Sequence, residues 1–149
     1  MEAINWFQTV VTKHYIDFQG RARRAEFWWY VLVYIIIDIV LTIIDNMLGT
    51  PLLAGLFGLA LLLPSIGVAV RRLHDTNRSG WWILLPVAPA ILGGVCLFVM
   101  PALSLIFYLA ALACSILLIV WYAMAGTAGP NQYGPDPKAG GAAAAAAHA

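Results

Sequence analysis

Arginine and tryptophan side chains gather in short polar stretches of this 149-residue chain. A guanidinium group matches the oxygen geometry of a phosphate, and an indole ring prefers the headgroup level of a membrane. Together they could hold the headgroup of an anionic lipid, unless the arginines serve only to orient the chain in the membrane. The candidate lipid-binding or anion-binding residues are Arg21, Arg23, Arg24, Arg71, Arg72, Arg78, Trp28, Trp81 and Trp82.

Glu26, His74 and Asp75 lie among these arginines. The two carboxylates could pair with arginines across the two stretches, either shaping a binding site or locking the stretches together. A histidine beside an aspartate also suggests a catalytic base, but sequence neighbours rarely face each other and no Ser or Cys nucleophile accompanies them. We therefore expect no catalytic residue and no enzymatic activity. Asp75 is expected to open the turn at residues 76–77.

Asp38 and Asp45 stand in or near an apolar stretch, seven residues apart and hence on one helical face. Carboxylates inside a membrane often mark a path for cations or protons, so these two are the candidate intramembrane site. The alternative is a protonated Asp38 that bonds to a neighbouring backbone or hydroxyl group.

Metal and cofactor chemistry has no signal in the sequence. Cys96 and Cys114 are expected at different depths in the membrane, as free thiols. No Cys-x-x-Cys motif or histidine pair at ligand spacing occurs. We expect no metal and no cofactor. The expected partners are membrane lipids, anionic ones among them, and a second copy of the chain or another membrane protein, but no nucleic acid.

Long charge-free stretches must position these residues. Hydrophobic residues make up 62% of the chain, charged residues only 10%, and the mean hydropathy is +0.86, which excludes an ordinary water-soluble core. About 20 apolar residues cross a bilayer. The predicted fold is an all-α integral membrane protein, a bundle of four transmembrane helices in residues 27–125 with a loop at 71–80. The spans are predicted at about residues 27–44, 51–70, 81–100 and 102–124. Pro64 in the second span, and Pro86 and Pro89 in the third, predict bends.

All eight Lys and Arg residues fall in segments 1–26, 71–80 and 126–149. With four spans these segments share one side of the membrane, and the positive-inside rule makes that side the cytoplasm. Both termini are therefore predicted to be cytoplasmic, and residues 126–149 form a tail rich in turn residues and alanine.

Residues 1–26 are predicted to hold an amphipathic helix and the first arginine-rich segment. Apolar side chains recur at steps of three and four residues, which is typical of a helix that lies in the membrane interface. The alternative is a short helix packed against the protein's own loops. The apolar positions are Ile4, Phe7, Val11, Tyr15 and Phe18.

Three polar strings stand out in this order. The first is Phe-Gln-Gly-Arg-Ala-Arg-Arg-Ala-Glu-Phe-Trp-Trp at 18–29, the second Arg-Arg-Leu-His-Asp-Thr-Asn-Arg-Ser-Gly-Trp-Trp at 71–82, and the third Gly-Pro-Asn-Gln-Tyr-Gly-Pro-Asp-Pro at 129–137. From about Trp6 to Lys138 the chain resembles the bacterial inner-membrane family known as domain of unknown function 805 (YhaH-like). Asn77 stands where the family pattern suggests Gly, and the alanine-rich tail departs from the pattern. The resemblance implies a small multi-spanning protein of the bacterial inner membrane, without an established biochemical role.

The leading functional hypothesis is non-enzymatic binding or scaffolding at the inner leaflet, through anionic lipid or a membrane partner. The alternative is a small channel or transporter subunit that uses Asp38.

Overall fold

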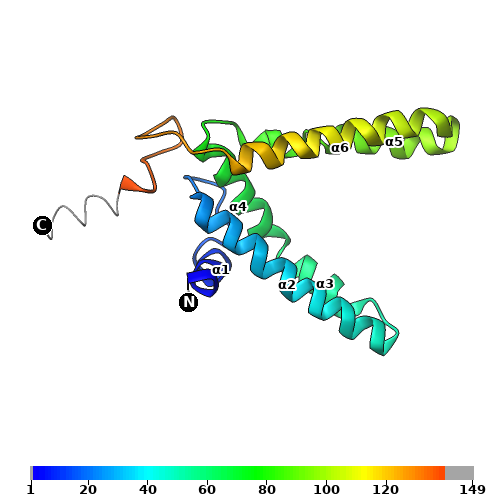
Figure 1. Ribbon diagram of the computed structural model, residues 1–149, viewed down its shortest axis with the longest axis horizontal. Helices are drawn as coiled ribbons and strands as arrows, with labels where there is room; N and C mark the ends of the chain where they lie inside the picture. Colours follow the sequence, from blue (N-terminus) through cyan, green and yellow to red (C-terminus); the bar gives the residue numbers. More distant parts are fainter. Residues whose placement is uncertain (1, 140–149) are drawn as a thin grey trace, which may run out of the picture.

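The computed structural model describes residues 2–139, which form helices and no strand (Figure 1). Their bounds are α1 Glu2–Lys13, α2 Arg24–Leu48, α3 Leu52–Ala60, α4 Leu62–Asp75, the 3-10 helix η1 Gly80–Leu84, α5 Val87–Val99 and α6 Pro101–Ala123.

The membrane helices form two hairpins that meet at one end (Figure 1). Helix α2 packs against both α3 and α1, while α5 packs along α6. The hairpins diverge away from the end formed by residues 14–26, 71–80 and 124–139, which we call the polar end. The expected single compact bundle is therefore replaced by two arms, which contact each other mainly where α4 meets η1 and, to a lesser extent, where α4 and α2 meet α6.

Three helical segments of the described chain are long and apolar enough to cross a membrane: Arg24–Leu48, Gly80–Val99 and Pro101–Ala123. A fourth span results if α3 and α4, which are bent by 48°, cross together. Helix α4 continues to Asp75, so Arg71 and Arg72 lie on a helix rather than in the expected loop. In the third predicted span, η1 ends at Leu84 and α5 begins after Pro86, where a bend was expected.

The bend between α3 and α4 follows from Pro64. Proline lacks an N–H, so the carbonyl of Ala60, four residues earlier, loses its helical hydrogen-bond partner. The hydroxyl of Tyr15 donates to that carbonyl, and Tyr30 donates to the carbonyl of Leu61 at 3.5 Å. Side chains from outside the helix thus satisfy the backbone groups at the break.

Tyr15→Phe is expected to cost about 1–3 kcal/mol of unfolding free energy, because the Ala60 carbonyl loses its donor in an apolar environment. Thermal unfolding in detergent micelles measures this cost. The control is Tyr108→Phe, which removes a hydroxyl without a hydrogen-bond partner among the described residues. Equal effects of the two variants would show that Tyr15 does not support the bend.

Helix α1 packs on α2 through Val10, which is fully buried, and Phe7, whose ring stacks on Tyr30 with centroids 5.4 Å apart. Helix α1 crosses α2 rather than running along it (Figure 1). Of the predicted apolar stripe, Tyr15 and Phe18 lie beyond the helix, because it ends at Lys13.

The α5–α6 hairpin owes its close approach to Gly93. A Cβ atom there would lie 3.0 Å from the ring of Tyr108, so a larger residue would require that ring to shift by a few tenths of an ångström. Cys96 and Cys114, one on each helix, are free and half-buried.

Candidate functional site

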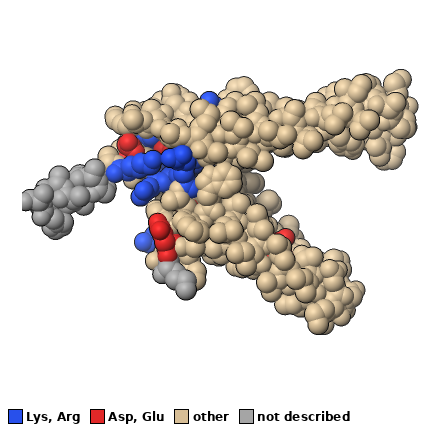
Figure 2. Space-filling model, viewed as in Figure 1, with Lys and Arg blue, Asp and Glu red and all other residues tan. Residues whose placement is uncertain are grey.

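Asp75 joins two of the three polar strings at the polar end, where Lys and Arg side chains gather between the hairpins (Figure 2). Its Oδ1 accepts from Nε of Arg21 at 3.0 Å and lies 2.9 Å from Nη2 of the same side chain. Its Oδ2 accepts from Nη1 of Arg72. All three side chains are buried, and Arg72 has no exposed surface. One carboxylate thus bonds to two buried guanidinium groups that come from different strings.

The same arginines hold the backbone of the C-terminal segment, residues 122–139. Arg21 donates to the carbonyl oxygens of Thr127 at 2.5 Å and Gly129 at 2.7 Å. Arg72 donates to those of Tyr122 at 2.9 Å and Met124. The last carbonyls of a helix have no partner within it, so Arg72 completes the end of α6. Asp75, Arg21 and Arg72 together form what we call the arginine lock.

Arg71 makes a second ion pair between the first two strings. Its Nη1 donates to Oε1 of Glu26 at 2.6 Å, and its carbonyl accepts from the N–H of Ala22 at 2.9 Å. Both charged side chains are buried. This pair confirms that an acid of the first string can bind an arginine of the second.

His74 contacts both other strings. Its Nδ1–H donates to the carbonyl of Gly20 at 2.9 Å, its ring stacks on Tyr133 with centroids 4.0 Å apart, and its carbonyl accepts from Asn131 at 2.9 Å. The Asp75 carboxylate bonds to arginines and does not orient His74. It also does not open the turn at residues 76–77, so that expectation was wrong. That turn is formed by Asn77 with φ 59°, a conformation that asparagine tolerates.

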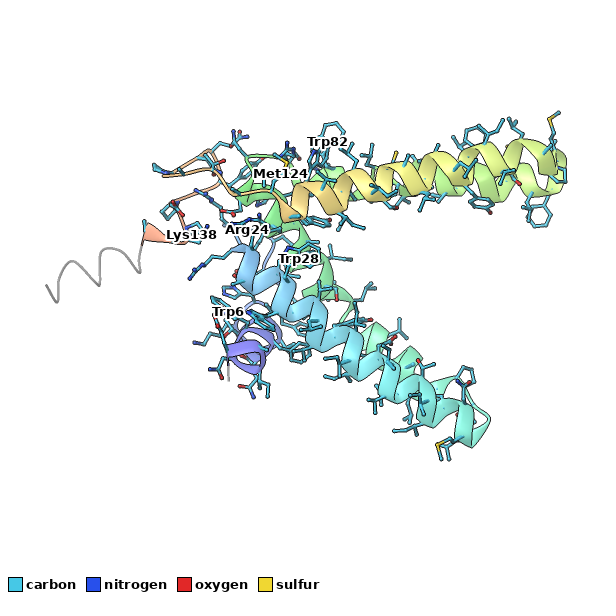
Figure 3. The ribbon with its side chains drawn as sticks, viewed as in Figure 1. Trp6, Arg24, Trp28, Trp82, Met124 and Lys138 are labelled. Carbon is cyan, nitrogen blue, oxygen red and sulfur yellow. The ribbon has the colours of Figure 1, made fainter. Side chains whose placement is uncertain are left out.

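The remaining arginines, Arg23, Arg24 and Arg78, have no acidic partner within 4 Å among the described residues. We call them the outer arginines. The guanidinium of Arg78 lies 4.5 Å from the ring of Trp121, and that of Arg23 lies 5.9 Å from the ring of Trp6. Arg24 lies where the hairpins meet (Figure 3) and donates to the carbonyl of Ala123 at 3.4 Å.

The candidate tryptophans surround the outer arginines without forming one cluster. Trp82 packs edge-to-face on Trp121 at 5.7 Å, which places it beside Arg78. Trp81 is 78% exposed, and Trp28, on the other hairpin, is also exposed. The nine candidate lipid-binding residues therefore fall into two sets. One consists of the three buried arginines, and the other of the outer arginines and the three tryptophans.

Asp45 caps helix α3. Its two carboxylate oxygens accept from the N–H groups of Leu53 and Ala54, each at 2.9 Å, and the residue is 4% exposed. Asp38 is half-buried, and no Lys, Arg or His nitrogen of the described chain lies within 4 Å of its carboxylate. Because Asp45 has a structural role, the transport hypothesis depends on Asp38 alone.

Asp45→Ala is expected to cost about 0.5–2 kcal/mol of unfolding free energy, the usual loss for an N-cap. Asp45→Asn keeps an oxygen that accepts from one N–H group, so we expect it to recover part of that loss. Chemical denaturation in detergent micelles compares the two variants. An asparagine variant as unstable as the alanine variant would show that the charge matters and the cap does not.

Asp136 organises the third string. It accepts from the N–H groups of Lys138 at 2.9 Å and Gly129 at 3.0 Å, and these two bonds, in that order, lower the pKa of its carboxyl below 3.8. Bonds to the ionised form stabilise the turn at pH values above 3.8, and that contribution disappears as the pH falls through the lowered pKa.

We expect the Gly129 amide to be protected from hydrogen exchange at pH 5 and to lose protection below the lowered pKa of Asp136. Measuring protection in the wild type over a pH series that descends from pH 5 tests the titration. Asp136→Asn should show the low protection throughout the series. A wild-type protection that does not change with pH would contradict this role.

Tyr15, Gly126 and Asn131 are structural participants that the sequence did not reveal. A Cβ atom on Gly126 would overlap the Asp75 carboxylate, so only glycine fits beside the arginine lock. The sequence marked the third string as a motif, but Arg21 binds it through backbone carbonyls. Every residue type has a carbonyl, so these contacts cannot be inferred from the sequence. Within residues 2–139, no group of three or more His, Cys, Asp or Glu could hold a metal ion.

Comparison with known proteins gives one consistent answer. The family description "Protein of unknown function (DUF805)" matches residues 15–135. The chain is 38% identical to the Escherichia coli K12 "Inner membrane protein YhaH" over 91% of this chain and 98% of the relative. It is 37% identical to "Inner membrane protein YhaI" over 92% and 98%, and 30% identical to "Uncharacterized protein YiiR" over 82% and 86%. No solved structure matches the chain.

Proposed function

The chain belongs to the DUF805 family of membrane proteins of unknown function, and on this premise we propose that it is a non-enzymatic scaffold that binds anionic lipid headgroups at the inner leaflet of a bacterial membrane. The outer arginines would make the headgroup contacts. The arginine lock would hold the two hairpins and the C-terminal segment together behind them.

We infer that the polar end faces the cytoplasm. Every Lys and Arg of the chain is in segments 1–26, 71–80 or 126–149, which supports this orientation under the positive-inside rule. Helix α1, which crosses α2 near this end, would then lie along the membrane surface. The names of two relatives place those proteins in an inner membrane.

The observation that carries the proposal is the division of the arginines into two sets. Arg21, Arg71 and Arg72 are buried and bonded to Asp75 or Glu26, so their side chains are not accessible to a lipid headgroup. The outer arginines have no acidic partner within 4 Å among the described residues. Two of them lie over tryptophan rings, and tryptophan favours the headgroup level of a membrane. The buried Nε of Arg23 has no hydrogen-bond partner among the described residues, but neither have Nε and Nη2 of Arg71, so this feature does not separate the two sets. A basic side chain near an anionic surface contributes about 1 kcal/mol.

Native mass spectrometry tests this proposal on protein released from nanodiscs of phosphatidylglycerol and phosphatidylethanolamine. We expect the wild type to retain phosphatidylglycerol, and the Arg23/Arg24/Arg78→Gln variant to lose most of it. The control, Lys13/Lys138→Gln, removes two exposed cationic charges elsewhere. Equal retention by the wild type and the arginine variant would contradict the proposal.

A further inference from the structure

A cavity of about 410 Å³ opens at the polar end between the α1–α2 linker, α4 and η1. This volume is within the usual range for small-molecule sites. Its walls are mainly apolar, with two polar side chains among them. The residues that matter here are Phe18, Ile66, Trp81 and Leu84 on the apolar walls, and His74 and Ser79 as the polar groups.

The two polar groups offer opposite hydrogen-bonding roles. Nδ1 of His74 faces the Gly20 carbonyl, so Nδ1 carries the proton and Nε2 of the neutral ring is an acceptor. Nε2 has no hydrogen-bond partner among the described residues. The Ser79 oxygen accepts from the N–H of Trp81 at 3.3 Å, which leaves the hydroxyl hydrogen free to donate. A ligand that satisfies both must carry a hydroxyl or N–H donor and an oxygen acceptor.

Charge narrows the class of ligand. No acidic side chain lines the cavity, while Arg78, an outer arginine, directly precedes Ser79 in the chain. Trp81, on the cavity wall, is largely exposed at the start of a segment apolar enough to cross a membrane. The cavity therefore suits an amphipathic, anionic molecule that approaches from the membrane.

We propose that this cavity binds a single glycerophospholipid with an anionic, hydroxylated headgroup. The ester oxygens would accept from Ser79, a headgroup hydroxyl would donate to His74, and an acyl chain would lie against Ile66 and Leu84. This inference rests on the proposed function and gives it a defined site, distinct from general attraction to the outer arginines.

Two variants test the proposal, and each places a bulky side chain in the cavity from a different wall. Ile66→Trp and Leu84→Trp are prepared in full-length protein, together with the control Ile39→Trp, which places the same ring on an exposed position of α2. Each variant is transferred to nanodiscs of phosphatidylglycerol and phosphatidylethanolamine and examined by native mass spectrometry. Thermal unfolding confirms that each variant is folded, and two filled positions are tested in case one variant fails.

We expect both cavity variants to retain phosphatidylglycerol roughly tenfold less than the wild type, as when about two CH2 groups of the acyl chain can no longer be buried. The Ile39→Trp control should retain as much as the wild type. Retention that falls only in the Arg23/Arg24/Arg78→Gln variant would overturn the cavity site while preserving the proposed function. Retention that falls only in the cavity variants would support the cavity site and would show that the outer arginines do not hold the lipid.

Discussion

Asp75→Asn is expected to lower the free energy of unfolding by about 3–5 kcal/mol, the largest effect of any single substitution considered. The substitution leaves two buried guanidinium groups without a counter-charge, since Asp75 pairs with both Arg21 and Arg72. These arginines also hold the backbone at Tyr122 and Thr127, so the C-terminal segment should detach in the same step. Chemical denaturation in detergent micelles measures the loss, and limited proteolysis detects the detached segment.

The matched control is Asp17→Asn. Asp17 also bonds to a side chain, the ring of His14 at 2.6 Å, but both side chains are about one-third exposed. Exposed pairs contribute about 0–1 kcal/mol, so this variant should remain close to the wild type. If Asp75→Asn proved no more harmful than Asp17→Asn, the arginine lock would not stabilise the protein.

Gly126→Ala should cost about 3 kcal/mol, at the upper end of the usual cost of overpacking. The added methyl group would overlap the carboxylate of Asp75, which cannot move aside without leaving Arg21 and Arg72. Most Gly→Ala substitutions are milder, so a large effect here would come from this contact. Thermal unfolding in detergent micelles gives the difference in stability.

Gly55→Ala on helix α3 is the control for that substitution. A Cβ atom there meets nothing within 4 Å, and alanine favours a helix over glycine by about 0.5–1 kcal/mol. We therefore expect Gly55→Ala to be neutral or stabilising. A Gly126→Ala variant that behaved like Gly55→Ala would mean that the C-terminal segment does not pack against Asp75.

The helices of this fold could be predicted from hydropathy, because apolar side chains in long runs decide which segments can cross a bilayer. Pairing between acids of one string and arginines of another was also foreseen, and the pair of Arg71 with Glu26 confirms it. Helix α4 continues past residue 70, where the second span was predicted to end. Charged residues favour a loop in a hydropathy analysis, whereas Arg71 and Arg72 continue the helix because each is paired with a buried acid.

The arrangement of the helices could not be predicted from the sequence. Hydropathy measures whether a segment enters the membrane and not which neighbour it packs against, so it could not separate two hairpins from one bundle. The third string shows a second limit. Its contacts with Arg21 are made by the carbonyls of Gly129 and Gly134, and every residue has a carbonyl.

Photo-crosslinking from position 133 tests most directly whether the three polar strings meet. Tyr133 is replaced by p-benzoylphenylalanine, an aromatic residue that carries a photoreactive benzoyl group in place of the hydroxyl, in protein held in nanodiscs. Since the ring of Tyr133 stacks on His74 at 4.0 Å, irradiation should link it to the tryptic peptide that follows Arg72 and ends at Arg78. Crosslinks confined to the C-terminal segment itself, or to lipid, would contradict the arginine lock and the division of the arginines that depends on it.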